Sequence, residues 1–202
     1  FNSFAEDEEN IAEFYPVSNH VLGLSKPTIE LSHLFGSAGK LKGYVDFGNI
    51  TRFEVVNSHG YDIFANYVLH EIAHQWSGAV QFFDEDRIER FDLLNEDNVH
   101  WSDYLGDLSP LGGAGWTSNE DGTFTSQTSL AALENHYGVT KRKFSQLDMY
   151  LMGLLPSVAV DPITYIVPGP GQFGDTIEAQ GFEVGIEQII SAEGPRVCTL
   201  DF

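Results

Sequence analysis

The chain has 202 residues, of which 42% are hydrophobic and 13% aromatic, and this fits one domain with a substantial core and excludes a disordered polymer. Lys and Arg total 10 against 30 Asp and Glu, a formal net charge of -20, and such a surface repels phosphate backbones and argues against a nucleic-acid partner. No apolar run reaches the roughly 18 residues of a membrane span, and the single cysteine, Cys198, excludes a disulfide within these residues.

The chain begins at Phe1 rather than at an initiator Met. We therefore expect residues 1–202 to be a single domain that belongs to a longer polypeptide or remains after cleavage. The excess of acidic residues suits a secreted, extracellular or cell-surface protein, although a need for solubility explains it equally well. No signal peptide is visible, and no pattern indicates an oligomeric state.

The first half of the chain predicts short strands followed by one amphipathic helix. Residues 41–47 and 51–56 are typical of strands, separated by the turn-forming pair Gly48-Asn49. Residues 61–77 predict a helix with Gly at both ends. Its apolar residues recur at spacings of three and four, and they are Phe64, Tyr67, Val68, Ile72 and Trp76. Residues 79–83 predict a further strand.

The second half mixes loops, helices and strands. Residues 84–98 are strongly acidic and are expected to be helical or looped, and residues 106–125, rich in Gly, Ser, Asn and Asp, indicate a long functional loop. The later predictions are helices over 130–137 and 144–155, a strand over 163–167, and a strand running into a helix over 184–192. Because helices and strands are mixed without a βαβ rhythm, the predicted fold class is α+β.

The helix predicted over residues 61–77 carries the sequence His70-Glu71-Ile72-Ala73-His74. A spacing of four puts both imidazoles on one helix face, about one turn apart, where two nitrogens can close on one Zn²⁺ at roughly 2.0–2.1 Å. Glu71 projects beside that position, where a carboxylate can take a proton from an attacking water and pass it to a leaving amine. This is the pattern of zinc peptidases, and its alternative is an ordinary His pair on a surface helix.

A catalytic zinc normally has three protein ligands and an open position, so a third ligand must come from elsewhere in the chain. The extended pattern with a further His is absent, because Val80 occupies that place. His100, the next His along the chain, is the first candidate. Asp148, a carboxylate among apolar neighbours that needs a strong partner, is the second. The remaining candidates are Glu134, His136, Glu89 and Glu96.

Tyr150 follows Asp148 by two residues, and its hydroxyl is a candidate for stabilising the oxyanion of a tetrahedral intermediate. The alternative places Tyr150 in an apolar core stripe with its helical neighbours. Asn119-Glu120-Asp121-Gly122 could ligate a structural Ca²⁺ through oxygens, although it is far shorter than a full calcium loop. Lys141-Arg142-Lys143 predicts an exposed turn, since three charges are too few for a nucleic-acid patch.

The run from Leu69 to Trp76 resembles a little-characterised group of bacterial secreted proteins with a zincin-like motif. In that group, similar segments correspond to His100-Trp101-Ser102, Gly113-Ala114-Gly115-Trp116, residues 145–154 and residues 186–197 of this chain. The resemblance covers roughly residues 35–197. It implies a zincin-like fold, with a central active-site helix packed on a small mixed sheet and a helical C-terminal part, and it favours His100 and Asp148 as site residues.

Three functions compete at this point. The first is a single catalytic domain that hydrolyses peptide bonds in a protein or peptide substrate, with zinc on His70, His74 and His100, Glu71 as general base, and Asp148 as a ligand or as a group that orients one. The second is a non-catalytic binding or adhesion module that retains a zinc site for structure, for which four ligands are expected. The third is a related metal hydrolase, such as an amidase or esterase.

Overall fold

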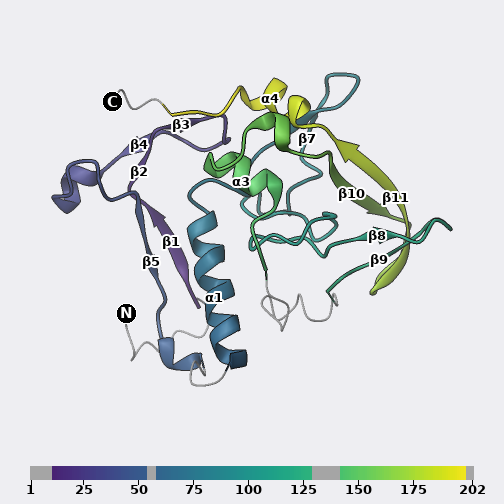
Figure 1. The fold of residues 1–202 in the computed structure, drawn as a ribbon, viewed down its shortest axis with the longest axis horizontal. Helices are drawn as coiled ribbons and strands as arrows, with labels where there is room; N and C mark the ends of the chain where they lie inside the picture. Colours follow the sequence, from purple (N-terminus) through teal and green to yellow (C-terminus); the bar gives the residue numbers. More distant parts are fainter. Residues whose placement is uncertain (1–10, 54–57, 129–141, 199–202) are drawn as a thin grey trace.

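The computed structural model describes residues 11–53, 58–128 and 142–198, and its longest helix stands between two groups of strands (Figure 1). This helix is α1 (Ser58–Ala73). The shorter helices α3 (Gln146–Met152) and α4 (Ile186–Glu193) lie beyond its C-terminal end. The 3₁₀ helices are η1 (Ser32–Phe35), η2 (Ile50–Arg52) and η3 (Ser157–Ala159). No helix in these described ranges is long and apolar enough to cross a membrane.

In the described part of the chain, the strands form one four-stranded sheet and four two-stranded ones, and all pairings between these strands are antiparallel. The larger sheet has the order β10-β11-β9-β8, with the bounds β8 (Thr117–Ser118), β9 (Thr123–Thr125), β10 (Ile163–Pro168) and β11 (Thr176–Val184). The small sheets pair β1 (Glu13–Pro16) with β5 (Gly43–Asp46), β2 (Ser18–Asn19) with β4 (Ile29–Glu30), β3 (Val21–Leu22) with β12 (Val197–Cys198), and β6 (Phe82–Phe83) with β7 (Glu89–Arg90).

The main hydrophobic core lies between α3, α4 and the loops around residue 101. Trp101 is fully buried at its centre, and Ala73 brings the last turn of α1 into the same cluster. The other large side chains fully buried in this cluster are Leu24, Leu93, Leu105, Leu111, Leu147, Leu151, Ile189, Val80 and Val184. The core therefore joins the end of α1 to the segment that follows His100.

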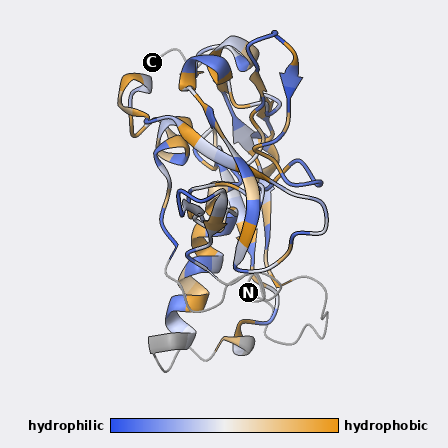
Figure 2. Cartoon of the chain, turned by 90° about the vertical axis from the view of Figure 1, so that its right-hand side faces the viewer, coloured by the Kyte–Doolittle hydropathy of each residue, from blue (hydrophilic) through white to orange (hydrophobic). Residues whose placement is uncertain are grey.

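The long strand β11 alternates hydrophilic and hydrophobic residues over most of its length (Figure 2). Ile177 of β11 packs with Ala114, Trp116 and Ile166 in a second cluster, while its neighbours along the strand are exposed. This is the period-two pattern of a sheet with one covered face. The four-stranded sheet thus closes one side of the core and leaves its other side to solvent.

Several sequence predictions are confirmed. The chain mixes helices and small sheets, as expected for an α+β protein. The helix predicted over 61–77 is α1, which begins at Ser58 and continues as turns from His74 to Ser77. The predicted strands 41–47, 79–83 and 163–167 correspond to β5, β6 and β10, and residues 184–192 hold the end of β11 and most of α4.

Other predictions are wrong or fall elsewhere. In the strand predicted over 51–56, the first residues belong to η2 instead, because the Asn49 side chain accepts a hydrogen bond from the Thr51 N–H at 3.0 Å and starts a turn. Residues 54–56 of this prediction lie outside the described residues. The described sheets are antiparallel rather than mixed. Residues 84–98 hold β7 and loops but no helix, and residues 106–125 include β8 and β9. The helix over 144–155 ends earlier, at Gly153 in a left-handed conformation. The helix expected over 130–137 lies outside the described residues.

Gly78 sets the spacing between α1 and the loop that carries His100. Its φ of +80° is in the left-handed region, and a Cβ added there would lie 2.4 Å from the carbonyl oxygen of Val99, a backbone atom that cannot rotate away. The chain leaving α1 therefore touches the residue directly before His100. A side chain at position 78 would push these two segments apart.

We expect Gly78→Ala to lower the free energy of unfolding by about 2–5 kcal/mol, the sum of left-handed strain and overpacking. Chemical denaturation measures this change. Gly39→Ala is the matched control, because Gly39 has the same φ of +80° with nothing within 4 Å of its added Cβ, so it should lose only the strain of about 1–2 kcal/mol. Equal losses in the two variants would contradict the close approach to Val99.

Candidate metal centre

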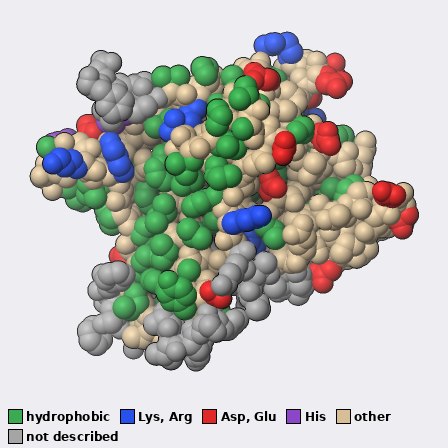
Figure 3. All heavy atoms as spheres, in the orientation of Figure 1, with side chains coloured by type: hydrophobic (Ala, Val, Ile, Leu, Met, Phe, Trp, Pro, Cys, Tyr) green, Lys and Arg blue, Asp and Glu red, His purple; other side chains and the backbone are tan. Residues whose placement is uncertain are grey.

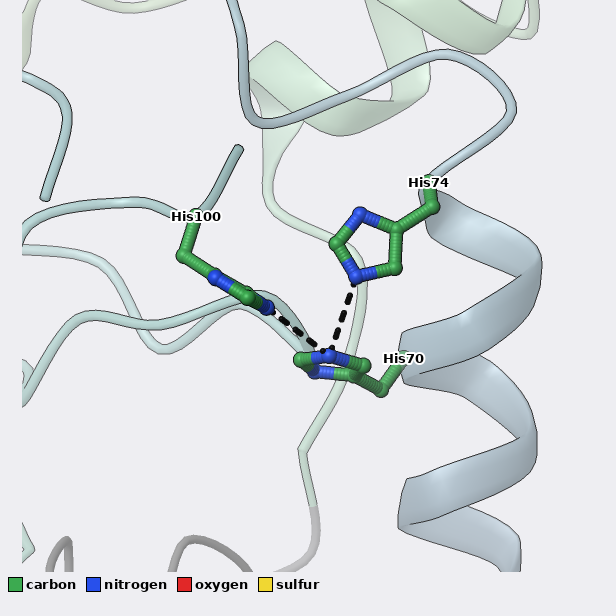
Figure 4. Close-up of side chains that lie close together, drawn as sticks. All are labelled: His70, His74 and His100. Atoms are coloured by element: carbon green, nitrogen blue, oxygen red, sulfur yellow. Dashed lines mark hydrogen bonds between the residues drawn. The ribbon is translucent and has the colours of Figure 1, made fainter. Parts of the chain in front are cut away.

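His70 and His74 project from the last turns of α1 toward His100, which comes from the facing loop (Figure 4). The His74 N–H donates to the His70 carbonyl at 3.3 Å, so the helical spacing persists through His74 and keeps both imidazoles on one side. His70 is buried, while His74 and His100 are partly buried. The helix supplies two of the three imidazoles and a loop supplies the third.

Asp97 shapes the loop that presents His100. One of its carboxylate oxygens accepts hydrogen bonds from the backbone N–H groups of Val99 at 3.0 Å and His100 at 3.2 Å, and the other accepts from Nδ1 of His100 at 2.5 Å. The next residue, Trp101, is fully buried and anchors the loop in the core. The His100 ring is thus oriented by a carboxylate, and the loop that carries it is held by the buried indole of the next residue.

The three Nε2 atoms converge. Nε2 of His70 lies 3.1 Å from Nε2 of His74 and 3.1 Å from Nε2 of His100. Nδ1 of His70 lies 2.9 Å from the Pro110 carbonyl oxygen. That oxygen can only accept, so Nδ1 carries the proton and Nε2 of the neutral ring carries a lone pair. The carboxylate of Asp97 imposes the same tautomer on His100. When both rings are neutral, their Nε2 lone pairs therefore face each other across 3.1 Å.

This arrangement fits a metal ion. The three histidines offer ligand nitrogens that all lie within 4.8 Å of one another. A tetrahedral ion about 2.0–2.1 Å from each nitrogen would separate them by about 3.3 Å, close to the distances observed. Burial, followed by the charges of His70 and His100, lowers the pKa of His74 to about 3. The imidazole therefore stays in the neutral form that binds metals.

The histidines line a cleft of about 790 Å³ together with Glu71. Glu71 is 5% exposed, and burial raises its carboxyl pKa to about 7, although a hydrogen bond from the Phe14 backbone partly opposes the rise. Other walls of the cleft come from β1, from the segment around Lys26 and from the Asn95–Gly112 loops. A group with a pKa near neutrality next to a metal-binding cluster can both accept and return a proton.

Asp148 does not belong to this cluster. It is 0% exposed, and its Oδ1 accepts a hydrogen bond from the Trp101 indole N–H at 2.9 Å. Its Oδ2 accepts from the backbone N–H and the hydroxyl of Ser145, each at 2.9 Å, and completes a capping box at the start of α3. The strong partner that a buried carboxylate requires is thus a helix cap and an indole. Asp148 supports His100 only through its neighbour Trp101.

Tyr150 is not among the residues that line the cleft, so the structure does not bring its hydroxyl to the histidines. Its ring belongs to the main core, and its hydroxyl accepts a hydrogen bond from the Arg196 backbone N–H at 3.3 Å. The core stripe is the correct interpretation of this residue. Arg196 in turn donates through Nε to the Leu151 carbonyl at 2.7 Å. Tyr150 therefore helps to attach the C-terminal segment to α3.

The other candidates are not brought to the cluster. Glu89 and Glu96 are exposed, and Glu134 and His136 lie outside the described residues. In the expected calcium turn, Asp121 Oδ1 instead accepts from the N–H and hydroxyl of Thr123 at 3.0 and 2.6 Å. Of the described residues, the histidine triad is the one group with metal-ligand geometry.

Arg142 corrects the expectation of an exposed basic turn. Its side chain is buried, and Nη1 donates to the carbonyls of Ser109, Gly112 and Gly113 at 2.7, 3.1 and 3.3 Å. These carbonyls belong to the loop that follows Trp101 and includes Pro110, the partner of His70. Arg142 therefore braces the loop whose backbone orients a histidine of the triad.

Three residues of the site escaped the sequence analysis. The sequence could have indicated Asp97, since an Asp three residues before a His can form hydrogen bonds with the intervening backbone and with the ring. It could not have indicated Pro110, because the bond to His70 uses a backbone carbonyl, which every residue has. Lys26 lies far from the motif in sequence, and only the folding of the N-terminal segment brings it to the cleft.

The chain matches no protein family, no curated protein and no solved structure. The geometry of the site therefore carries the functional argument alone.

We expect the purified protein to bind about one divalent ion per chain, because the triad forms one site. His70→Ala, His74→Ala and His100→Ala should each lose this ion in elemental analysis after equilibration with zinc. His33→Ala is the matched control, since His33 is exposed and distant from the cluster in η1. Asp148→Asn should retain the ion, and loss of metal in that variant would place Asp148 among the ligands after all.

Asp97→Asn should weaken zinc binding about 10- to 100-fold, the usual effect of removing a carboxylate that orients a ligand histidine. Competition with a chromophoric chelator measures the dissociation constant. Glu96→Gln, an exposed neighbour, should leave it unchanged. An unaltered affinity in Asp97→Asn would show that the loop orients His100 without this carboxylate.

Proposed function

We propose that the chain is a zinc-dependent hydrolase of peptide bonds with a zincin-like active site on α1. The observation that carries this proposal is the convergence of the Nε2 atoms of His70, His74 and His100 in the wall of an open cleft, beside the carboxyl of Glu71. The distances between these atoms and the tautomers set by Asp97 and Pro110 favour an ion at their centre.

The number of ligands favours catalysis over a structural role. Structural zinc sites usually have four protein ligands, whereas catalytic ones have three and keep a position open. Over the described ranges the cluster contains three histidines and no carboxylate. The cluster also lines a cleft instead of being sealed in the core. A binding or adhesion module with a structural zinc is therefore the weaker alternative.

Zinc bound at such a site would act as a Lewis acid toward water and toward the carbonyl of the substrate. Glu71 would take the proton of the attacking water and later give it to the leaving amine. A carboxyl group with a pKa raised to about 7 by burial is suited to both transfers near neutral pH. Its hydrogen bond from the Phe14 backbone would hold the carboxylate at the edge of β1.

The apolar lining of the cleft supports a protein or peptide as the substrate. Much of its lining is apolar, with Ile11, Phe14, Pro16, Ile29 and Val99 among its residues. Such walls accept side chains while a few polar groups orient the main chain. An amidase or esterase would use the same chemistry, and hydrolysis of small amides or esters without cleavage of peptides in a substrate panel would favour it.

Glu71→Gln should lower the rate of peptide hydrolysis by about 10²- to 10⁴-fold, the range expected when a general base is removed, while the zinc content stays at that of the wild type. Peptide cleavage followed by mass spectrometry, together with elemental analysis, measures both. Glu96→Gln controls for the loss of one acidic charge. Full activity in Glu71→Gln would exclude this mechanism.

A further inference from the structure

Lys26 places a positive charge in the wall of the cleft next to the metal centre. It lines the cleft together with His74, and its charge is one of the causes that lower the pKa of His74. The preceding turn uses left-handed conformations at Gly23 and Ser25, and Leu24 is anchored in the main core. Lys26 therefore lies on a segment that the main core holds in position through Leu24.

The far side of this segment is also held. The Asn19 side chain donates to the Pro27 carbonyl at 3.4 Å, and β2 pairs with β4 through the partners Ser18–Glu30 and Asn19–Ile29. The loop that contains Lys26 is thus closed at its base by strand pairing and pinned near its middle by a side chain. A cation on such a loop keeps its place relative to α1.

Lys26 is half-buried, and its ammonium group has lost solvation without gaining a counter-charge from the described residues. Desolvation lowers its pKa to about 8, and no carboxylate of the described chain contributes an opposing effect. Hydrophobic side chains gather on the face of the molecule over α1 and the neighbouring strands, which carries few Lys or Arg side chains (Figure 3). Burial of an unpaired ammonium is costly, and a ligand that brings a carboxylate would offset this cost.

Four carboxylates line the cleft, and one of them, Asp103, contributes no effect to the pKa of Lys26. The other three have hydrogen-bond partners of their own. Asp97 bonds His100, Glu13 accepts a hydrogen bond from the Tyr15 hydroxyl at 2.6 Å, and Glu71 is bonded by the Phe14 backbone. Each of these three carboxylates thus has another partner, in a protein whose net charge is -20. Among the residues that the structure describes, Lys26 therefore lies in the cleft without a paired carboxylate.

We propose that Lys26 binds a carboxylate of the substrate, close to the bond that is cleaved. This inference rests on the proposed hydrolase function, which it deepens by naming the substrate class. The carboxylate can belong to an acidic side chain or to the C-terminus of a peptide. A lysine ammonium suits either, because it acts as a point charge with three donors and does not demand the planar geometry that an arginine prefers.

Binding to zinc-loaded Glu71→Gln protein tests the proposal without requiring hydrolysis. The probes are fluorescent octapeptide pools in matched pairs, titrated by anisotropy at about 0.15 M salt to screen the distant acidic surface. In the first pair, both pools have amidated C-termini, and one carries Glu where the other carries Gln at internal positions. In the second pair, all side chains are neutral, and one pool has a free C-terminus where the other has an amidated one. We expect the acidic member of one pair to bind about 10-fold or more tightly, as for a charge-assisted hydrogen bond.

Variants of Lys26 in the same background then locate the preference. Lys26→Met should abolish it, Lys26→Arg should retain part of it, and Lys26→Glu should reverse it, so that the amidated or Gln probe binds more tightly. Lys40→Met is the matched control, since Lys40 is exposed and outside the cleft and its loss changes the net charge equally. Thermal denaturation with zinc content checks that each variant is folded.

The outcomes separate this proposal from the hydrolase function. Equal binding of both members of each pair, or a preference that survives Lys26→Met, would overturn the role of Lys26. A weakening of acidic and neutral probes alike in Lys26→Met would also overturn it, because the residue would then act on all peptides. A Lys26-dependent preference in a wild-type protein that hydrolyses no peptide would overturn the hydrolase and leave a carboxylate-binding cleft.

Discussion

The facing lone pairs of His70 and His100 are the interaction on which the site depends. Each Nδ1 donates its proton to an oxygen that can only accept, the Pro110 carbonyl in one case and the Asp97 carboxylate in the other. When both rings are neutral, both Nε2 atoms are therefore acceptors at 3.1 Å, and a cation bound between them removes the repulsion between their lone pairs. The Pro110 carbonyl and the Asp97 carboxylate thus favour a cation at the centre of the triad.

The scaffold around the triad keeps these atoms close by different means on its two sides. On α1 the spacing follows from the helix itself, so His70 and His74 need little further support. The loop with His100 is held by the buried Trp101, whose indole N–H is bound by Asp148, and by the close approach of Gly78 to Val99. The helical spacing thus positions His70 and His74, and the packed core positions the loop that carries His100.

The sequence was most informative where chemistry is local. The motif on α1 and the choice of His100 could be predicted, because spacing along a helix is a geometric rule and His100 is the next His along the chain. Asp148 and Tyr150 could not be placed, since a buried carboxylate is satisfied equally well by a metal, a helix cap or an indole. Lys26 and Pro110 come to the site only through tertiary folding. For the same reason the strand pairings remained largely beyond prediction, apart from the strands themselves.

His70 and His100 are 30 residues apart in the chain, so an ion held between them is a crosslink that closes a long loop. The unfolded chain has no preformed site, and binding energy at the triad becomes folding energy. A hundredfold excess of free metal over its dissociation constant would add about 2.7 kcal/mol to the free energy of unfolding. Metal supply would then control how often the segment between α1 and Trp101 opens, and with it the lifetime of the protein among proteases.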